Sequence, residues 1–390
     1  MSDTTFAPPP SANADPDEFR GLPGWIYSNA RFFEAEKEKV LAPSWQVVCH
    51  LNDIPKVGDF HTFDFIGESI IVVRGKDGVP RAFNNVCLHR AARLLDGSSG
   101  QCNRIVCPYH AWTYDLEGKL IGAPLRETYP DLRIGERRLP PIDLEVFKGF
   151  IFVRIEGDGP SVAEMMAPYA EELEPYRFEE LQPFGRVTLR PRPVNWKNIG
   201  DNYSDGLHIV VAHPGLTRLF GKGYGVEAAP MVDKMWGHLL DDPSDNPSER
   251  AYQAILPDVE HLPPDRKRLW TYFKLWPNVA FDIYPDQVDF MQFIPISATQ
   301  TMIREIAYAL PDSRREMKAA RYLNWRINRQ VNAEDTELVA RVQQGMASRR
   351  FEPGPLSETE VSLRSFGRKL RGLIPEARLH RPPPAWAPGA

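Results

Sequence analysis

The chain has 390 residues, with 47 basic and 52 acidic side chains and a formal net charge of −5. This length exceeds what one hydrophobic core usually supports, so we expect about two domains. The acidic total disfavours nucleic-acid binding, which needs a basic surface to neutralise phosphates. No segment approaches the roughly 18 consecutive apolar residues of a membrane span, so we predict no membrane contact.

The N-terminal residues and the cysteines indicate the compartment. The chain starts with MSDTTFAPPPSANADPDEF, which is polar, acidic and proline-rich and lacks the basic and apolar regions of a secretory signal. Four cysteines in 390 residues are too few for a disulfide scaffold, so they are free thiols or metal ligands. We therefore expect a cytoplasmic protein. Cys49 and Cys102 lie outside any motif, and we assign them no role.

The first half of the chain reads as a tail followed by a β domain. Residues 1–44 combine a disordered start with a short helix over 30–41, which we expect to pack on the C-terminal domain. Residues 45–157 contain short β-forming runs, such as FHTFDF at 60–65, separated by glycine turns. Since no helical pattern lies between these runs, they predict a small antiparallel β domain.

The second domain is predicted to cover residues 158–390, after the GDGP boundary signal. Its pattern mixes helices and strands, so the whole chain belongs to the α+β class. We expect strands near 187–190, 269–273, 279–283, 288–294 and 302–310. We expect helices near 163–173, 195–213, 313–330, 335–348 and 357–373, the last starting with the capping-box pattern SETE.

Two cysteines and two histidines stand at metal-ligand spacing inside the predicted β domain. Cys87 pairs with His89 and Cys107 with His110, and 17 residues separate the two pairs. Such pairs on two loops suit either tetrahedral zinc or a [2Fe–2S] cluster with two cysteines on one iron and two histidines on the other. Zinc sites usually combine Cys-x2-Cys pairs or His-x3-5-His pairs, so this spacing favours the cluster.

A second group of possible ligands lies in the segment that ends at His213. Asp205 and His208 are three residues apart and share one helical face. His208 and His213 are five residues apart, so on a regular helix they would point about 140° apart. To bind one metal they need a π-bulge or a helix break between them. Two imidazoles and a carboxylate make the facial triad that activates dioxygen at Fe(II).

Helix periodicity selects Asp335 as the third ligand. In the predicted helix over 335–348, Asp335 lies on the face of the apolar stripe that starts at Leu338. Glu334 and Glu337 are predicted to point to solvent. A carboxylate aimed into a core is costly unless it is paired or metal-bound. The alternative, in which Asp335 merely begins the helix as an acid favoured by the dipole, stays open, and Glu334 is the fallback ligand.

These motifs resemble those of Rieske non-heme iron oxygenase α-subunits, the ring-hydroxylating oxygenase family. The matching segments are CLHR at 87–90, CPYHAWTY at 107–114 and NWKNIGDNYSDGLH at 195–208, followed by a histidine and a downstream Glu-Asp. The resemblance covers about residues 20–375 and implies a Rieske [2Fe–2S] domain over 45–157 and a helix-grip catalytic domain over 158–390. It implies cluster ligands and iron ligands at these positions: Cys87, His89, Cys107 and His110 for the cluster, and His208, His213 and Asp335 for Fe(II).

The resemblance also implies an electron path and its partners. A reductase or ferredoxin would pass electrons from NAD(P)H to the cluster, and Asp205 would bridge a cluster histidine, His110, to His208 of a neighbouring subunit. Dioxygen and a small-molecule substrate would meet at the iron. Such proteins are usually trimers, so we expect a homotrimer. The chain departs from the family pattern at three positions. Asp201 stands where the family usually has Glu and Leu207 where it usually has Tyr, and these two could reshape the pocket. Ala111 stands where the family usually has Gly, which should matter little.

The segment from Asp201 to Leu216 looks nearer to the branch of the family that oxidises choline, carnitine and betaines. We therefore predict hydroxylation of an N-methyl group, with loss of formaldehyde, on a quaternary or tertiary amine such as a proline betaine. An aromatic box would hold the ammonium by cation–π attraction. Its candidates are aromatic residues of the predicted strands and adjoining turns: Trp270, Tyr272, Phe273, Trp276, Phe281, Tyr284 and Phe290.

Three other functions remain open from the sequence. The runner-up is an aromatic-ring hydroxylating dioxygenase. A different class is a non-catalytic Rieske electron carrier fused to a ligand-binding domain, which would hold two irons per chain where the oxygenase holds three. A zinc protein would be colourless.

Overall fold

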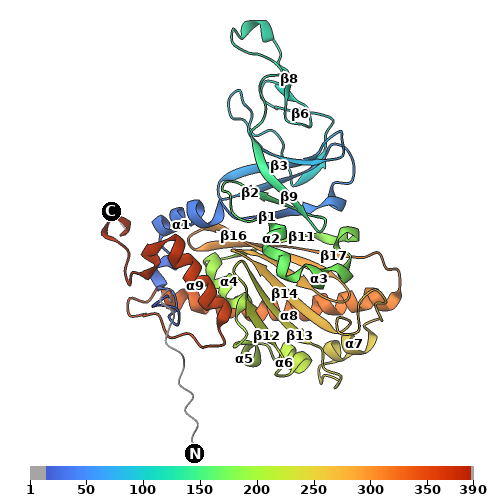
Figure 1. The fold of residues 1–390 in the computed structure, drawn as a ribbon, viewed down its shortest axis with the longest axis vertical. Helices are drawn as coiled ribbons and strands as arrows, with labels where there is room; N and C mark the ends of the chain where they lie inside the picture. The colour runs from blue at the N-terminus through green and yellow to red at the C-terminus, as the bar shows by residue number, and fades with distance from the viewer. Residues whose placement is uncertain (1–14, 388–390) are drawn as a thin grey trace, which may run out of the picture.

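The structure, a computed structural model, describes residues 15–387, and the predicted disordered start at residues 1–14 lies outside them. Figure 1 shows a smaller β part stacked on a larger part in which helices surround a sheet. This arrangement confirms the α+β prediction. None of the helices in the described part of the chain has the length and hydropathy needed to cross a membrane.

The β part is built from antiparallel strands because its apolar residues alternate with polar ones. Along one strand, for example, Phe63 and Phe65 are buried on either side of the exposed Asp64. One sheet has the order β1-β10-β9-β4-β3-β2-β5 and a smaller one the order β6-β7-β8. Their bounds are β1 (Gln46–His50), β2 (Asp59–Phe65), β3 (Glu68–Arg74), β4 (Pro80–Asn84), β5 (Ser99–Gln101), β6 (Ile105–Val106), β7 (Thr113–Tyr114), β8 (Leu120–Gly122), β9 (Pro141–Phe147) and β10 (Phe150–Arg154).

The larger part contains a seven-stranded antiparallel sheet with the order β11-β17-β16-β15-β14-β13-β12. Its strands are β11 (Gln182–Arg192), β12 (Gly225–Ala228), β13 (Val232–His238), β14 (Leu269–Leu275), β15 (Val279–Ile283), β16 (Val288–Ser297) and β17 (Gln300–Ala309). The helices are α1 (Ala30–Glu36), α2 (Val162–Met166), α3 (Ala170–Leu173), α4 (Trp196–Ser204), α5 (Ile209–Ala212), α6 (Pro214–Phe220), α7 (Pro247–Ile255), α8 (Arg315–Met346) and α9 (Val361–Leu373).

Both faces of this sheet are covered, so its central strands are buried along their whole length. Successive side chains of a strand point to opposite faces. On one face Phe273, Phe281 and Phe290 pack in a single core with Phe150 of the β part and with α2. On the other face Tyr272, Asp282 and their neighbours line a cavity next to α4 and α8. The sheet therefore joins the two parts of the chain with one face and builds the cavity with the other.

The N-terminal segment lies against α4, which carries part of the candidate site. The predicted helix over 30–41 is present as α1 followed by a π-helical turn, η2 (Lys37–Leu41). Glu36 and Lys197 of α4 are fully buried, and their charged groups are 2.7 Å apart. Burial raises the pKa of Glu36 and lowers that of Lys197, and each partner opposes the shift of the other. This pair anchors α4 to the start of the described chain.

Several of the predicted helices differ from the observed ones. The predicted helices over 313–330 and 335–348 form one continuous helix, α8, in which the side chains of Asn332 and Thr336 bond to backbone carbonyls four residues earlier. The predicted helix over 163–173 is divided at Pro168. The last helix begins only at Val361, although Glu360 does accept the Ser357 N–H expected of the capping box.

Candidate metal centres

The two Cys/His pairs of the β part lie on two loops that repeat the same backbone hydrogen bonds. In the first loop the Ala91 N–H donates to the Cys87 carbonyl at 3.0 Å, and in the second the Ala111 N–H donates to the Cys107 carbonyl at 3.0 Å. Because the loops match, they present the two pairs side by side. They lie in the upper part of Figure 1, next to β6 and β8.

The four side chains form a buried pair of thiols and an outer pair of imidazoles. Cys87 and Cys107 are 2% exposed and belong to the core of the β part. The Nδ1 atoms of His89 and His110 are 3.1 Å apart, and both rings are only partly buried. Separate thiol and imidazole pairs fit a [2Fe–2S] cluster with one pair on each iron. A single zinc ion would need four ligand atoms that converge on one point. In the described part of the chain, the ligand atoms of these two cysteines and two histidines do not form such a group.

Ala111 stands where the resembled family usually has glycine. Its φ of 55° and that of Ala91, 56°, lie in the left-handed region, which a Cβ disfavours by about 1 kcal/mol or more. The loop nevertheless keeps the hydrogen bonds of its counterpart, so its shape does not depend on glycine.

We expect Ala111→Gly to raise the free energy of unfolding by about 1 kcal/mol, because glycine adopts a positive φ without strain. Ala340→Gly, in the middle of α8, should lower it by about the same amount. Thermal unfolding of the two variants measures this difference. Equal destabilisation by both would contradict the strained conformation of Ala111.

The second candidate centre depends on an interruption of the helix. α4 ends at Ser204, Asp205 is extended with φ −81° and ψ 125°, and α5 starts at Ile209. The Asp205 carboxylate accepts the backbone N–H groups of Leu207 at 2.8 Å and His208 at 3.2 Å and so starts the next turn. This interruption precedes both histidines. The helix break predicted for the segment from His208 to His213 comes at His213, where the backbone leaves the helical conformation with φ −119° and ψ 76°, between α5 and α6.

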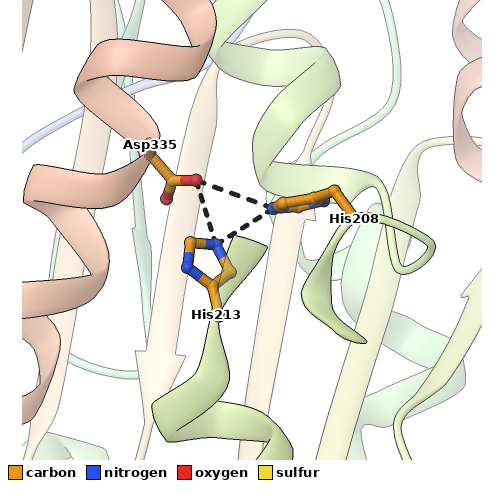
Figure 2. A group of neighbouring side chains, drawn as sticks. All are labelled: His208, His213 and Asp335. Atoms are coloured by element: carbon orange, nitrogen blue, oxygen red, sulfur yellow. Dashed lines mark hydrogen bonds and ion pairs between the residues drawn. The ribbon is translucent and has the colours of Figure 1, made fainter. Parts of the chain in front are cut away.

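Three potential ligand atoms lie close together, as Figure 2 shows. The Nε2 atoms of His208 and His213 are 3.1 Å apart. Oδ1 of Asp335 lies 3.0 Å from His213 Nε2 and 3.6 Å from His208 Nε2. Within residues 15–387 this is the group of His, Cys, Asp or Glu side chains that can hold one metal ion. Its donor set is that of a facial triad.

Asp335 lies in the interior of α8, so the alternative in which it begins a helix is wrong. Asn202 of α4 donates to its Oδ1 at 2.8 Å and helps to orient it. Burial alone would raise the pKa of Asp335, but hydrogen bonds from the two histidines outweigh it and lower the pKa to about 2. The group is thus a carboxylate at neutral pH, as metal binding requires.

Two further carboxylates orient the imidazoles. His208 Nδ1 lies 3.0 Å from Asp205 Oδ2, and His213 Nδ1 lies 2.8 Å from Glu334 Oε2. Both Nδ1–H groups can therefore donate outward, which leaves the Nε2 lone pairs for a metal. Burial would lower the pKa of His208, but its hydrogen bonds with Asp205 and Asp335 raise it to about 9. The surroundings therefore favour a positive charge at this place, whether a proton or a metal ion carries it.

The prediction that Glu334 points to solvent was wrong. Its side chain is folded back onto His213 and is bonded also by Gln330 at 3.0 Å. Helix periodicity had placed it on the solvent side of α8, and the sequence contains no signal for the His213 side chain that it meets. Neither departure from the family pattern lines the cavity: Asp201 accepts the Tyr27 hydroxyl at 2.9 Å, and Leu207 is 48% exposed.

The cavity beside the triad contains only two of the seven aromatic residues that we proposed for a box, Tyr272 and Tyr284. Phe273, Phe281 and Phe290 pack on the opposite face of the sheet, as strand alternation could have indicated, whereas Trp270 and Trp276 pack in other clusters and do not line the cavity. Residues that the sequence reasoning missed also line it: Tyr203, Tyr224, Asp282, Asp289, Glu305 and Arg192.

Comparisons with known proteins agree with this geometry. The model of the ring-hydroxylating α-subunit catalytic domain matches residues 178–376, and that of the Rieske [2Fe–2S] domain matches residues 44–137. The chain belongs to the ring-hydroxylating α-subunit family of Rieske oxygenases. It is an oxidoreductase whose cofactors are a [2Fe–2S] cluster and a mononuclear iron.

Its relatives include the carnitine monooxygenase oxygenase subunit of Escherichia coli K12, which is 32% identical over 89% of both chains. The glycine betaine monooxygenase oxygenase subunit of Pseudomonas aeruginosa PAO1 is 32% identical over 52% of this chain and 47% of its own length. The structure resembles that of a quaternary ammonium Rieske monooxygenase in complex with L-carnitine, with a TM-score of 0.76, 26% identity and coverage of 93% of this chain and 99% of the other.

Glu334 offers a direct test of how the site holds its metal. We expect Glu334→Ala to weaken binding of the mononuclear iron by about 10- to 100-fold, because His213 loses the acceptor that sets its tautomer and orientation. Glu337→Ala is the matched control, since Glu337 lies one turn away on α8, is 69% exposed and pairs with Arg341. Competition for iron against a chelator measures the affinity. Equal iron affinity in the two variants would show that Glu334 does not support His213.

Proposed function

We propose that this Rieske oxygenase hydroxylates an N-methyl group of a quaternary or tertiary amine, such as a proline betaine, which then loses formaldehyde. The observation that carries the proposal is the composition of the cavity beside the triad, in which tyrosine rings surround a buried carboxylate, Asp282. The similarity to oxygenase subunits named for carnitine and glycine betaine supports the same substrate class.

The four tyrosines form a continuous aromatic wall. The ring centroid of Tyr272 lies 6.4 Å from that of Tyr203, 6.3 Å from that of Tyr224 and 6.1 Å from that of Tyr284. Among the described residues no hydrogen bond engages the Tyr272 hydroxyl, although the residue is only 8% exposed. Ring faces of this kind attract an alkylammonium group, and more strongly where water is excluded.

Asp282 supplies the charge that matches such a cation. Its Oδ1 accepts the Tyr203 hydroxyl at 2.5 Å, and it lies opposite Asp289 in the register of β15 and β16. Burial and the nearby charge of Glu305 raise its pKa to about 7 against the hydrogen bonds that stabilise the carboxylate. A buried carboxylate without a positive partner is costly, so a cationic ligand stabilises the ionised form.

We propose His208, His213 and Asp335 as the iron ligands, and Cys87, His89, Cys107 and His110 as the cluster ligands. When bound, the mononuclear iron supplies the activation of dioxygen. The chain itself orients the ligands through Asp205 and Glu334, holds the substrate against the tyrosine rings and keeps bulk water from the reacting methyl group. The overall conversion consumes one dioxygen and two electrons with two protons, and it yields water and an N-hydroxymethyl product that releases formaldehyde.

We propose that the electrons come from another subunit of a homotrimer. In Figure 1 the region of β6 and β8, next to the cluster loops, lies at the opposite end of the molecule from α5, which is next to the triad. Asp205 keeps 19% of its side chain exposed, which leaves it accessible to a partner. We propose that it bridges His208 to His110 of a neighbouring subunit and that a reductase or ferredoxin supplies electrons from NAD(P)H.

The aromatic-ring hydroxylase is the weaker alternative. An arene would leave Asp282 in the cavity without a positive partner. The likeness to naphthalene 1,2-dioxygenase, with a TM-score of 0.73 and 20% identity over 93% of this chain and 94% of the other, concerns the fold. Membership of an oxygenase family and the presence of a facial triad disfavour the electron carrier and the zinc protein.

A substrate panel separates the candidates. With a reductase and NAD(P)H, we expect formaldehyde in amounts equal to the demethylated amine from one or more betaines, and no cis-diol or phenol from naphthalene or biphenyl. His213→Ala should reduce the iron content from three to two per chain, keep the cluster spectrum and abolish turnover. Diol formation without formaldehyde would favour the ring hydroxylase, and full activity of His213→Ala would exclude the triad as the reaction site.

The pKa of Asp282 predicts the pH dependence of substrate binding. Below pH 7 the carboxyl is mainly protonated and neutral, and above it the charged form attracts the ammonium, so KM should fall about tenfold between pH 6 and pH 8. Asp282→Asn keeps an oxygen that accepts the Tyr203 hydroxyl but cannot ionise, so its KM should stay high and vary little over this range. The same pH step in both proteins would assign the titration to another group.

A further inference from the structure

A second groove on the outer side of the catalytic part adjoins the catalytic cavity. It lies between β11, β17 and α8 and shares a polar neck with the cavity. The residues that line both are Arg192, Asp289, Glu305, Asn328, Asn332 and Thr336. Because these residues face both spaces, a ligand in the cavity near the triad can extend toward the groove.

The groove and the cavity have opposite charge. Five cations line the groove against two acids, Asp289 and Glu305, and the cations are Arg190, Arg192, Lys318, Arg321 and Arg329. Burial and the nearby charge of Glu305 raise the pKa of Asp289 well above its usual range. In the cavity, Asp205 and Asp335 contact the triad histidines, and Asp282 lies among the tyrosines, while Arg192 is the Lys or Arg side chain among the lining residues. A ligand that spans the neck therefore meets negative charge at its inner end and positive charge at its outer end.

Arg192 is the cation at the junction, and no acid of the described residues pairs with it. Its hydrogen bond is to the carbonyl of Pro191 at 3.2 Å. Its neighbour Arg190, in contrast, forms an ion pair with Glu305 and contacts Asn332. Burial and the charge of Arg190 lower the pKa of Arg192. A partly buried guanidinium without a counter-ion is costly, and an anionic ligand group offsets that cost.

We propose that Arg192 binds the carboxylate of the substrate, so that the enzyme accepts zwitterionic N-methylated amino acids and excludes simple quaternary cations. This inference rests on the proposed function and narrows its substrate class. The ammonium end lies among the tyrosines beside Asp282, and the carboxylate end forms a charge-assisted, bidentate contact with the guanidinium. A cation without a carboxylate, such as choline, leaves Arg192 unpaired and meets the positive groove on entry.

Glycine betaine and choline make the sharpest pair of probes, since both carry a trimethylammonium group and choline has a hydroxymethyl in place of the carboxylate. Calorimetry measures their binding to the purified protein without turnover. We expect wild type to bind glycine betaine at least about tenfold more tightly than choline, because a hydrogen-bonded charge is lost with the carboxylate. A longer betaine, γ-butyrobetaine, reports the distance that the site accepts between ammonium and carboxylate.

Variants of Arg192 locate the contact. Arg192→Met should weaken betaine binding by about 10- to 100-fold and leave choline binding unchanged or stronger. Arg192→Lys retains the charge but not the bidentate geometry, so it should lie between wild type and Arg192→Met. Arg329→Met is the matched control, because Arg329 lines the groove over the Trp325 ring at 5.3 Å but does not line the cavity. The visible spectrum of the cluster verifies that each variant is folded.

The possible outcomes test the role of Arg192 separately from the proposed N-demethylation. Equal binding of choline and glycine betaine by wild type, or an unchanged ratio in both Arg192 variants, would overturn the role of Arg192 even while betaines release formaldehyde. Absence of formaldehyde from every amine, together with oxidation of arenes, would instead overturn the proposed function. A loss of betaine affinity in Arg329→Met equal to that in Arg192→Met would assign the effect to the general charge of the groove.

Discussion

Two interruptions of the helix, one after Ser204 and one at His213, are the constraint on which the catalytic site depends. On a continuous helix, histidines five residues apart point in different directions and cannot bind one metal. The extended Asp205 redirects the chain, and its carboxylate both starts the next turn and accepts His208 Nδ1–H. Asp205 therefore orients one imidazole of the site. The nonhelical backbone of His213, with φ −119° and ψ 76°, accompanies the close approach of the other imidazole, whose Nε2 lies 3.1 Å from that of His208.

α4 keeps a fixed position although it ends at Ser204, because buried polar contacts hold it on several sides. Lys197 is paired with Glu36 of the N-terminal segment, and Lys274 of the sheet donates to the carbonyl of Gly200 at 3.2 Å. Asn202 connects the same helix to Asp335 on α8. Buried charges are stable only when they are paired, so these contacts favour one position of α4 relative to both neighbours. The position of α4 therefore also determines where the candidate iron ligands lie.

The central sheet separates structural and chemical tasks by the alternation of its strands. Phenylalanines on one face join the two parts of the chain, whereas Tyr272, Asp282 and Glu305 on the other face line the cavity. Charge then varies along the cavity, from the carboxylates near the triad to Arg192 at the neck. An apolar arene gains no electrostatic stabilisation from this arrangement of charges, whereas a molecule with separated positive and negative groups is complementary to it.

Local spacing in the sequence was sufficient for the metal chemistry and the fold class. Short-range patterns predicted the two Cys/His pairs, the need for a helix break before His213 and several strands of both parts, because ligand spacing and strand alternation are properties of neighbouring residues. They did not predict β12 and β13. Tertiary structure alone decided the rest. Glu334 meets His213, 121 residues away in the chain, and Arg192 reaches the cavity from an edge strand. No local pattern encodes such contacts, because they arise only when separate elements pack together.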